Sequence, residues 1–156
     1  MRFEYTYRNT GLDLWQLSMY YTYGSMVGVC NVIFTAAVWV LTVIRWGEAG
    51  DFMRIALVFG CLLFPVIQPF MVYQKARRQA AGITKDTKIA FDERGIHIAV
   101  GEERSDLDWR SIKRVSKKPT LIIIFSDTTH GFILPNRILG TEREKFYQFV
   151  TSKIKK

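Results

Sequence analysis

Two long runs of apolar residues dominate the first half of the chain. Residues 24–44 read GSMVGVCNVIFTAAVWVLTVI and residues 55–74 read IALVFGCLLFPVIQPFMVYQ, and neither run contains a charged residue. As helices that rise about 1.5 Å per residue, each would reach roughly 30 Å, the thickness of the hydrocarbon core of a bilayer. The pattern predicts a two-helix transmembrane hairpin with residues 45–54 as a short external loop. Two buried helices of a soluble domain are the alternative interpretation.

The second half of the chain changes to a period of two residues. Short stretches within residues 87–134 alternate apolar and polar positions, which predicts antiparallel strands joined by hairpins. The turn at residues 92–95 is interpreted as a hairpin with Gly95 in the left-handed conformation. Residues 141–144, TERE, fit a capping box before an amphipathic helix whose polar face includes Lys155. We therefore predict an α+β membrane protein in which residues 87–156 form a cytoplasmic half-barrel, like a pleckstrin-homology (PH) domain, with a C-terminal amphipathic helix.

The N-terminal segment also carries a strand pattern. Phe3, Tyr5 and Tyr7 alternate with polar residues, so residues 1–9 are predicted to add a strand to the C-terminal sheet and cover one of its edges. Residues 10–23 predict an interfacial helix that leads into the first span. Residues 75–86 are interpreted as a basic linker between the second span and the sheet.

Charge gives the predicted orientation of the hairpin. The formal net charge is +8, and residues 75–156 hold 18 Lys and Arg against 10 Asp and Glu, whereas residues 1–74 hold four of each kind. Because Lys and Arg concentrate on the cytoplasmic side of membrane spans, both termini are predicted to be cytoplasmic.

Several small or polar side chains lie within the predicted spans. One face of the first span carries Gly24, Gly28, Asn31 and Thr35. Such a face predicts close packing, either on the second span or on another copy of the chain in a homo-oligomer. In the second span, Gln68 lies between Pro65 and Pro69, which are expected to kink or open the helix. Gln68 is interpreted either as part of a binding or conduction site or as a hydrogen-bond partner of Asn31, Thr35 or a freed carbonyl.

The sequence offers little that suggests catalysis. Cys30 and Cys61 lie in different spans at depths about 10 Å apart, which predicts reduced thiols. His97 and His130 lie in separate predicted strands and have no ligand-like neighbours in sequence. Phosphate loops, nucleophile motifs and metal-ligand spacings are absent from the sequence. We therefore expect no enzymatic activity, no catalytic residues, no cofactor and no metal site.

Basic residues supply the candidate contacts to anionic lipid headgroups or to a protein partner. The set comprises Lys75, Arg77, Arg78, Lys113, Arg114, Lys117 and Lys118. Arg137, in the segment Pro135-Asn136-Arg137, has two interpretations: it helps to turn the chain after a strand, or it contacts an anion or partner. No nucleic-acid partner is expected, because these residues are not interleaved with exposed aromatic residues in a known module.

Three motifs, taken in order, carry a resemblance to a family. The segments IAFDERGIHI, LDWRSIKRV and FILPNRIL, which follow an aromatic N-terminal segment and two spans, resemble the YcxB-like family of bacterial membrane proteins across nearly the whole chain. The resemblance implies a PH-like C-terminal domain and location in the bacterial inner membrane. It implies no established chemistry.

Two hypotheses about function follow. In the first, a nonenzymatic membrane protein uses its cytoplasmic PH-like domain as a protein- or lipid-interaction module at the inner leaflet. In the alternative, a small membrane immunity protein or transporter accessory protein acts on another membrane protein through its transmembrane hairpin.

Overall fold

The computed structural model describes residues 1–127 and 130–154, so Lys155 lies outside the described residues. The chain divides into two compact units. One comprises Met1–Asp13 and Gly82–Lys156, and the other comprises Leu14–Ala81. We call the first unit the module. Its chain is interrupted by the whole of the second unit, which is helical.

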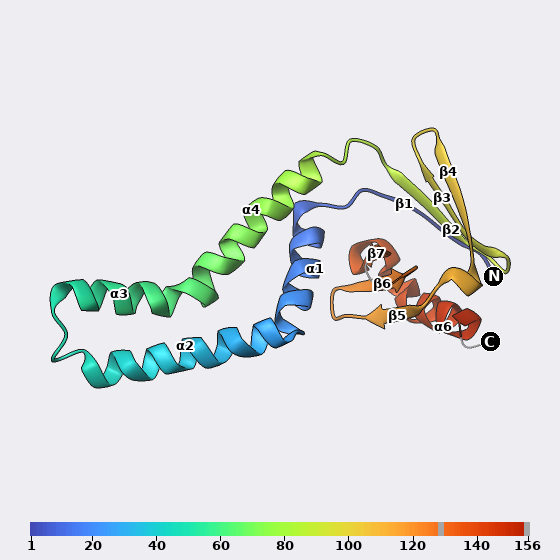
Figure 1. Ribbon diagram of the computed structural model, residues 1–156. Helices are drawn as coiled ribbons and strands as arrows, with labels where there is room; N and C mark the ends of the chain where they lie inside the picture. Colours follow the sequence, from blue (N-terminus) through green and yellow to red (C-terminus); the bar gives the residue numbers. More distant parts are fainter. Residues whose placement is uncertain (128–129, 155–156) are drawn as a thin grey trace. The chain divides into compact units, whose positions relative to one another are not determined.

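The helical unit is built around a hairpin of two long helices. Helix α1 (Gly11–Tyr23) precedes α2 (Met26–Arg45), and the return arm consists of α3 (Asp51–Leu62), a π-helical turn (Leu63–Ile67) and α4 (Gln68–Ala81). Both arms, Met26–Arg45 and Asp51–Ala81, are long and apolar enough to cross a membrane. Only 11% and 6% of their most apolar windows are buried, whereas the core helix of a soluble protein is mostly buried. We call these two arms the apolar hairpin (Figure 1).

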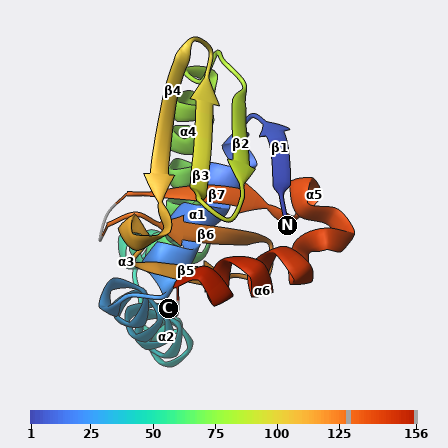
Figure 2. The ribbon, with the colours of Figure 1, turned by 90° about the vertical axis from the view of Figure 1, so that its right-hand side faces the viewer.

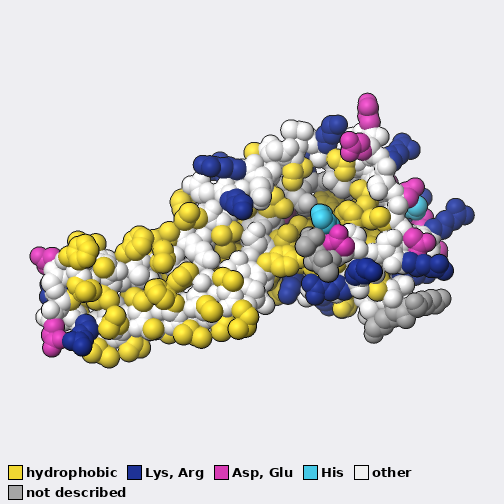
Figure 3. Space-filling model, in the orientation of Figure 1, with side chains coloured by type: hydrophobic (Ala, Val, Ile, Leu, Met, Phe, Trp, Pro, Cys, Tyr) yellow, Lys and Arg dark blue, Asp and Glu magenta, His cyan; other side chains and the backbone are white. Residues whose placement is uncertain are grey.

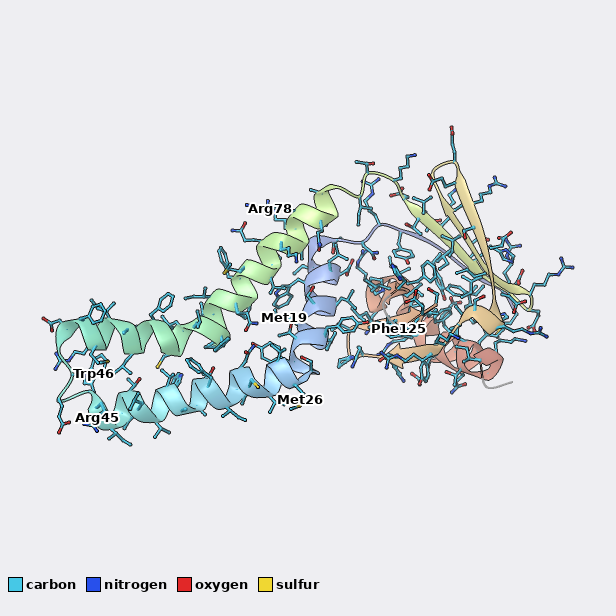
Figure 4. The ribbon with its side chains drawn as sticks, viewed as in Figure 1. Met19, Met26, Arg45, Trp46, Arg78 and Phe125 are labelled. Atoms are coloured by element: carbon cyan, nitrogen blue, oxygen red, sulfur yellow. The ribbon has the colours of Figure 1, made fainter. Side chains whose placement is uncertain are left out.

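Charged and apolar residues are segregated along this hairpin. Apolar side chains cover its arms, and charged side chains lie at the connection between α2 and α3 (Figure 3). Arg45 and Trp46 mark this connection, whereas Arg78 lies near the other end of the return arm (Figure 4). The apolar hairpin therefore carries an uncharged belt between two charged ends, as a membrane-crossing segment requires.

The module contains two antiparallel sheets. The first has the order β1-β2-β3-β4, made of Phe3–Tyr7, Thr87–Phe91, Gly95–Val100 and Glu103–Asp108 (Figure 2). The second has the order β5-β6-β7, made of Arg114–Lys117, Leu121–Phe125 and Gly131–Pro135. A 3-10 turn, Trp109–Ser111, follows β4, and the chain ends in α5 (Asn136–Leu139), a second 3-10 turn (Gly140–Glu142) and α6 (Arg143–Ile154). The helices and the two antiparallel sheets confirm the expected α+β class.

The N-terminal strand is part of the module core. β1 pairs antiparallel with β2 from Phe3 opposite Phe91 to Tyr7 opposite Thr87. Its three aromatic residues are buried, whereas the polar residues between them are exposed. The Phe3 ring lies 5.5 Å from that of Phe146 on α6, in an edge-to-face arrangement. The alternation seen in the sequence thus corresponds to one buried and one exposed face.

Two local predictions were wrong. Gly95 does not adopt a left-handed conformation, because positive φ angles occur in the described chain only at Gly101 and Gly140. Gly95 instead begins β3 where a Cβ atom would lie 2.2 Å from the carbonyl oxygen of Leu107, so close strand approach requires the glycine. The predicted capping box does not form either. The last helix, α6, begins at Arg143 within residues 141–144, but the Glu144 carboxylate pairs with Lys117.

Replacement of Phe3 by Ala tests the contribution of β1. The Phe3 side chain is 6% exposed, and removal of a buried phenyl ring costs about 3–5 kcal/mol. We expect the free energy of opening of the β2 and β3 amides, measured by native-state hydrogen exchange on the full-length protein in detergent, to fall by about 3 kcal/mol. Thr6→Ala, on the exposed face of the same strand, should change it by less than about 1 kcal/mol. Equal effects of the two changes would contradict this role of β1.

Candidate functional site

The basic candidate residues around β5 differ in their exposure and in their interaction partners. Lys113 and Arg114 are exposed, and the Arg114 guanidinium lies 4.3 Å from the ring centroid of Phe125. Phe125 belongs to the neighbouring strand β6 (Figure 4). This cation–π contact holds the stem of Arg114 on the sheet without neutralising its charge. Lys113 and Arg114 therefore form an exposed basic pair, which we call the β5 basic pair.

Lys117 is engaged within the module. Its Nζ lies 2.6 Å from the Glu144 carboxylate and 5.2 Å from the ring centroid of Tyr147. The hydrogen bond from Lys117 lowers the pKa of Glu144 below its usual value. Next along the chain, the main-chain carbonyl of Lys118 accepts a hydrogen bond from Arg143 at 2.7 Å. Lys117 thus pairs β5 with α6, and its charge is largely balanced.

The other basic candidates belong to the helical unit. Lys75, Arg77 and Arg78 are exposed on the last two turns of α4, which continues to Ala81. Residues 75–81, interpreted from the sequence as part of a linker, are therefore helical. These three cations form a second exposed basic group, the α4 basic group, on a different unit from the β5 basic pair.

Arg137 makes an internal ion pair. Its Nη2 donates to Asp13 Oδ2 at 2.7 Å and to the carbonyl oxygen of Arg8 at 2.8 Å. Asp13 is 5% exposed, and the same carboxylate oxygen accepts hydrogen bonds from the amide and hydroxyl of Thr10. The guanidinium that the sequence offered as an anion or partner contact thus balances a buried carboxylate at the start of α1.

The neighbouring residues show why Pro135-Asn136-Arg137 occurs here. Pro135 ends β7, and the Asn136 amide donates to the carbonyl of Thr120 at 2.9 Å while its side chain donates to that of Pro119 at 2.7 Å. These bonds fix the chain direction from β7 into α5 and position Arg137. Burial, followed by the nearby charge of Asp13, raises the pKa of Tyr7 to about 12, although Arg137 offsets part of this effect. Tyr7 therefore stays neutral at physiological pH.

The polar residues of the helical unit make local bonds. Asn31, 6% exposed, donates from Nδ2 to Gln68 Oε1 at 2.9 Å, and Thr35 donates to the Asn31 carbonyl at 2.7 Å. The π-helical turn around Pro65 lets the Gln68 amide bond to the carbonyl of Leu63, five residues earlier. Gln68 thus meets Asn31 across the hairpin, one of the partners suggested by the sequence.

The two glycines of the predicted packing face do not pack against the second span. They pack against the backbone at the end of α1. Gly24 lies in the turn before α2, where a Cβ atom would meet the carbonyl oxygen of Tyr20 at 2.7 Å. At Gly28 a Cβ atom would lie 2.5 Å from the Cα atom of Tyr23. Both glycines therefore permit the sharp connection between α1 and α2. Cys30 and Cys61 are free thiols, and Cys61 Sγ lies 3.4 Å from Thr42 Oγ1.

Sequence reasoning missed the surroundings of His97. Its Nδ1 lies 2.7 Å from Asp106 Oδ1 and its Nε2 lies 3.1 Å from Asp92 Oδ2. If both ring nitrogens donate, the ring is an imidazolium. The hydrogen bond with Asp106, followed by that with Asp92, raises the pKa of His97. The β3–β4 register places His97 opposite Asp106. This pairing could have been predicted from the sequence by folding the hairpin around Gly101.

The second histidine has a local partner. His130 Nδ1 lies 2.9 Å from Asp127 Oδ2. Over residues 1–127 and 130–154, no group of three or more His, Cys, Asp or Glu side chains is arranged to hold a metal ion. The candidate binding groups in the described residues are therefore the exposed cations, whereas the ion pairs hold the module together.

Comparison with known proteins adds one relationship. This chain combines an α+β module with a hairpin apolar enough to cross a membrane, and residues 91–150 match the family model described as YcxB-like protein. The resemblance seen in the sequence is confirmed over these residues, which extend from the end of β2 into α6. Searches of curated proteins and of solved structures found no match.

The Asp13–Arg137 pair can be tested by a double substitution. Arg137→Gln leaves the buried Asp13 charge without its partner, and we expect this change to destabilise the module by about 1–3 kcal/mol. Asp13→Asn combined with Arg137→Gln should recover part of the loss, because no unpaired carboxylate remains. The measurement is the hydrogen-exchange stability of β1 and β2 at neutral pH. A double variant no more stable than Arg137→Gln would contradict this account.

The His97 contacts predict a pH dependence. Because the folded-state pKa of His97 is raised above its unfolded value of about 6.5, its stabilisation is fully present below the unfolded pKa and is lost as pH rises through the folded pKa. The contribution should not exceed about 1 kcal/mol, since the His97 side chain is 40% exposed. Comparison of wild type with His97→Gln at pH 5.5 and 8.5 should show a larger stability difference at the lower pH. A difference that grows with pH would contradict the prediction.

Proposed function

We propose that this chain is a nonenzymatic bacterial inner-membrane protein whose cytoplasmic module binds a protein partner or anionic lipid at the inner leaflet. The observation that carries the proposal is the position of the apolar hairpin in the chain, between the paired strands β1 and β2. Both ends of a membrane-crossing hairpin would then lead into one sheet. Such a connection would hold the module at the bilayer through two attachments, with both termini in the cytoplasm.

The distribution of exposed cations supports an inner-leaflet location. The α4 basic group follows the apolar part of the return arm directly. At the other end of the hairpin, residues 45–54 hold two basic residues balanced by two acidic ones, Arg45 and Arg54 with Glu48 and Asp51. This asymmetry follows the positive-inside rule. The β5 basic pair supplies further exposed charge on the module, where each cation near an anionic surface contributes about 1 kcal/mol.

The proposed fold of the module is a PH-like half-barrel. Support comes from the four-stranded and three-stranded antiparallel sheets followed by a C-terminal helix. Phe146 and Val150 of that helix are fully buried against the core. A scaffold of this kind presents loops and sheet edges to ligands, and catalytic groups are not required for such a role.

An alternative function places the activity in the apolar hairpin. The Asn31–Gln68 hydrogen bond and the π-helical turn that contains Pro65 favour it, because polar groups and helix irregularities at membrane depth often serve function. The protein would then be a small immunity or transporter accessory protein that acts on another membrane protein, or it would pair with its own copies.

Purification of the tagged full-length protein in mild detergent tests these functions. Masses of co-purifying proteins and retained lipids are recorded for wild type, for Lys113→Gln/Arg114→Gln and for Asn31→Leu/Gln68→Leu. If the module binds anionic lipid, loss of the β5 basic pair should reduce retained anionic lipid at least about fivefold. If the module instead binds a protein, that protein should be lost from the β5 variant and kept by the hairpin variant.

The control is Lys145→Gln, which removes an exposed charge from α6. It should leave retained lipid and co-purifying protein within about twofold of wild type. A partner lost only from the hairpin variant would overturn the module-based function in favour of the alternative. Lipid and protein profiles unchanged in all variants would contradict both.

A further inference from the structure

The exposed face of the first sheet contains a hollow of about 450 Å³. Residues from all four strands line it, and the small side chains of Ala90 and Ala99 lie among charged neighbours. We call this feature the outer-face hollow, defined by Lys88, Ala90, His97, Ala99, Arg104 and Asp106. These residues belong to β2, β3 and β4, which lie side by side in Figure 2.

The strand register places two cations on either side of an alanine. Lys88 of β2 is opposite Ala99 of β3, and Ala99 is opposite Arg104 of β4. Directly opposed residues have Cβ atoms about 5 Å apart and share one face of the sheet. The short side chain of Ala99 therefore leaves a space that the longer side chains of Lys88 and Arg104 flank.

The acidic groups around the hollow already have partners. Glu4 pairs with Arg2 at 3.2 Å, and Asp106 pairs with His97 at 2.7 Å. Over residues 1–127 and 130–154, Lys88 and Arg104 take part in none of the ion pairs of the structure. The hollow thus contains two cations, Lys88 and Arg104, that form no ion pair within the described residues and lie around its alanine floor.

We propose that the outer-face hollow binds a phosphate group, with Lys88 and Arg104 as its ligands. The guanidinium fork offers two parallel hydrogen bonds to phosphate oxygens, and the ammonium group supplies a compact second charge. Two cations balance the charge of a phosphate monoester, which approaches −2 at neutral pH. The phosphate comes either from a soluble ion or ester or from the headgroup of a lipid such as phosphatidic acid. The lipid source rests on the proposed membrane function, whereas the soluble source does not.

The test uses the full-length protein in nanodiscs of phosphatidylcholine. Binding of inorganic phosphate is measured by isothermal titration at constant ionic strength, and retention of phosphatidic acid is measured by mass spectrometry in discs that contain both lipids. Lys88→Gln/Arg104→Gln should weaken the binding at least about tenfold, because charge-assisted hydrogen bonds are lost. Ala99→Leu should weaken it similarly, since it fills the floor and leaves every charge in place.

The matched control is Arg110→Gln/Lys145→Gln, which removes two exposed charges outside the hollow. It should leave binding within about twofold of wild type. Binding of soluble phosphate or of phosphatidic acid that is lost only in the hollow variants supports the site and identifies its source. Absence of both, or equal losses in the control, overturns it. Loss of anionic lipid on removal of the β5 basic pair, with unaffected hollow variants, would overturn this site while leaving the proposed function intact.

Discussion

The antiparallel pairing of β1 with β2 is the constraint on which the rest of the structure depends. Residue Tyr7 at the end of β1 lies opposite Thr87 at the start of β2, and the entire apolar hairpin lies between them in sequence. Strand pairing fixes these two backbone positions about 5 Å apart. The hairpin is thus an insertion into a sheet, and its two ends leave the module from neighbouring strands.

Because of this pairing, the N-terminal residues belong to the same domain as the region that the family model matches. The match itself begins only at residue 91. Phe3 and Tyr5 both make edge-to-face contacts with Phe146, whose side chain is fully buried. A fragment that begins after the hairpin would lack these rings. It would also leave one edge of β2 without its hydrogen-bond partner, which is costly in a small domain with a limited core.

The sequence predicted the elements with strong periodicity and missed contacts that depend on tertiary placement. The alternation at Phe3–Tyr7 identified a strand, because one face is buried and the other is exposed. The end of α4 was placed too early, since hydropathy marks the apolar stretch while Ala, Arg, Gln and Lys continue a helix well. The Asp13–Arg137 pair joins residues far apart in sequence, and no local pattern signals it. The His97–Asp106 pair, by contrast, follows from hairpin register.

Ion pairing changes how the excess of positive charge should be read. Arg137 balances buried Asp13, Lys117 meets Glu144, and Lys153 meets Glu93, so these three cations of the module, like Arg2 and Arg8, are paired internally. Two pairs of cations that remain exposed lie on different elements: Lys113 and Arg114 lie on or beside β5, and Lys88 and Arg104 lie on β2 and β4. The two groups belong to different sheets. Each group can therefore be changed without altering the other, so their contributions to binding are separable by substitution even though both carry the same charge.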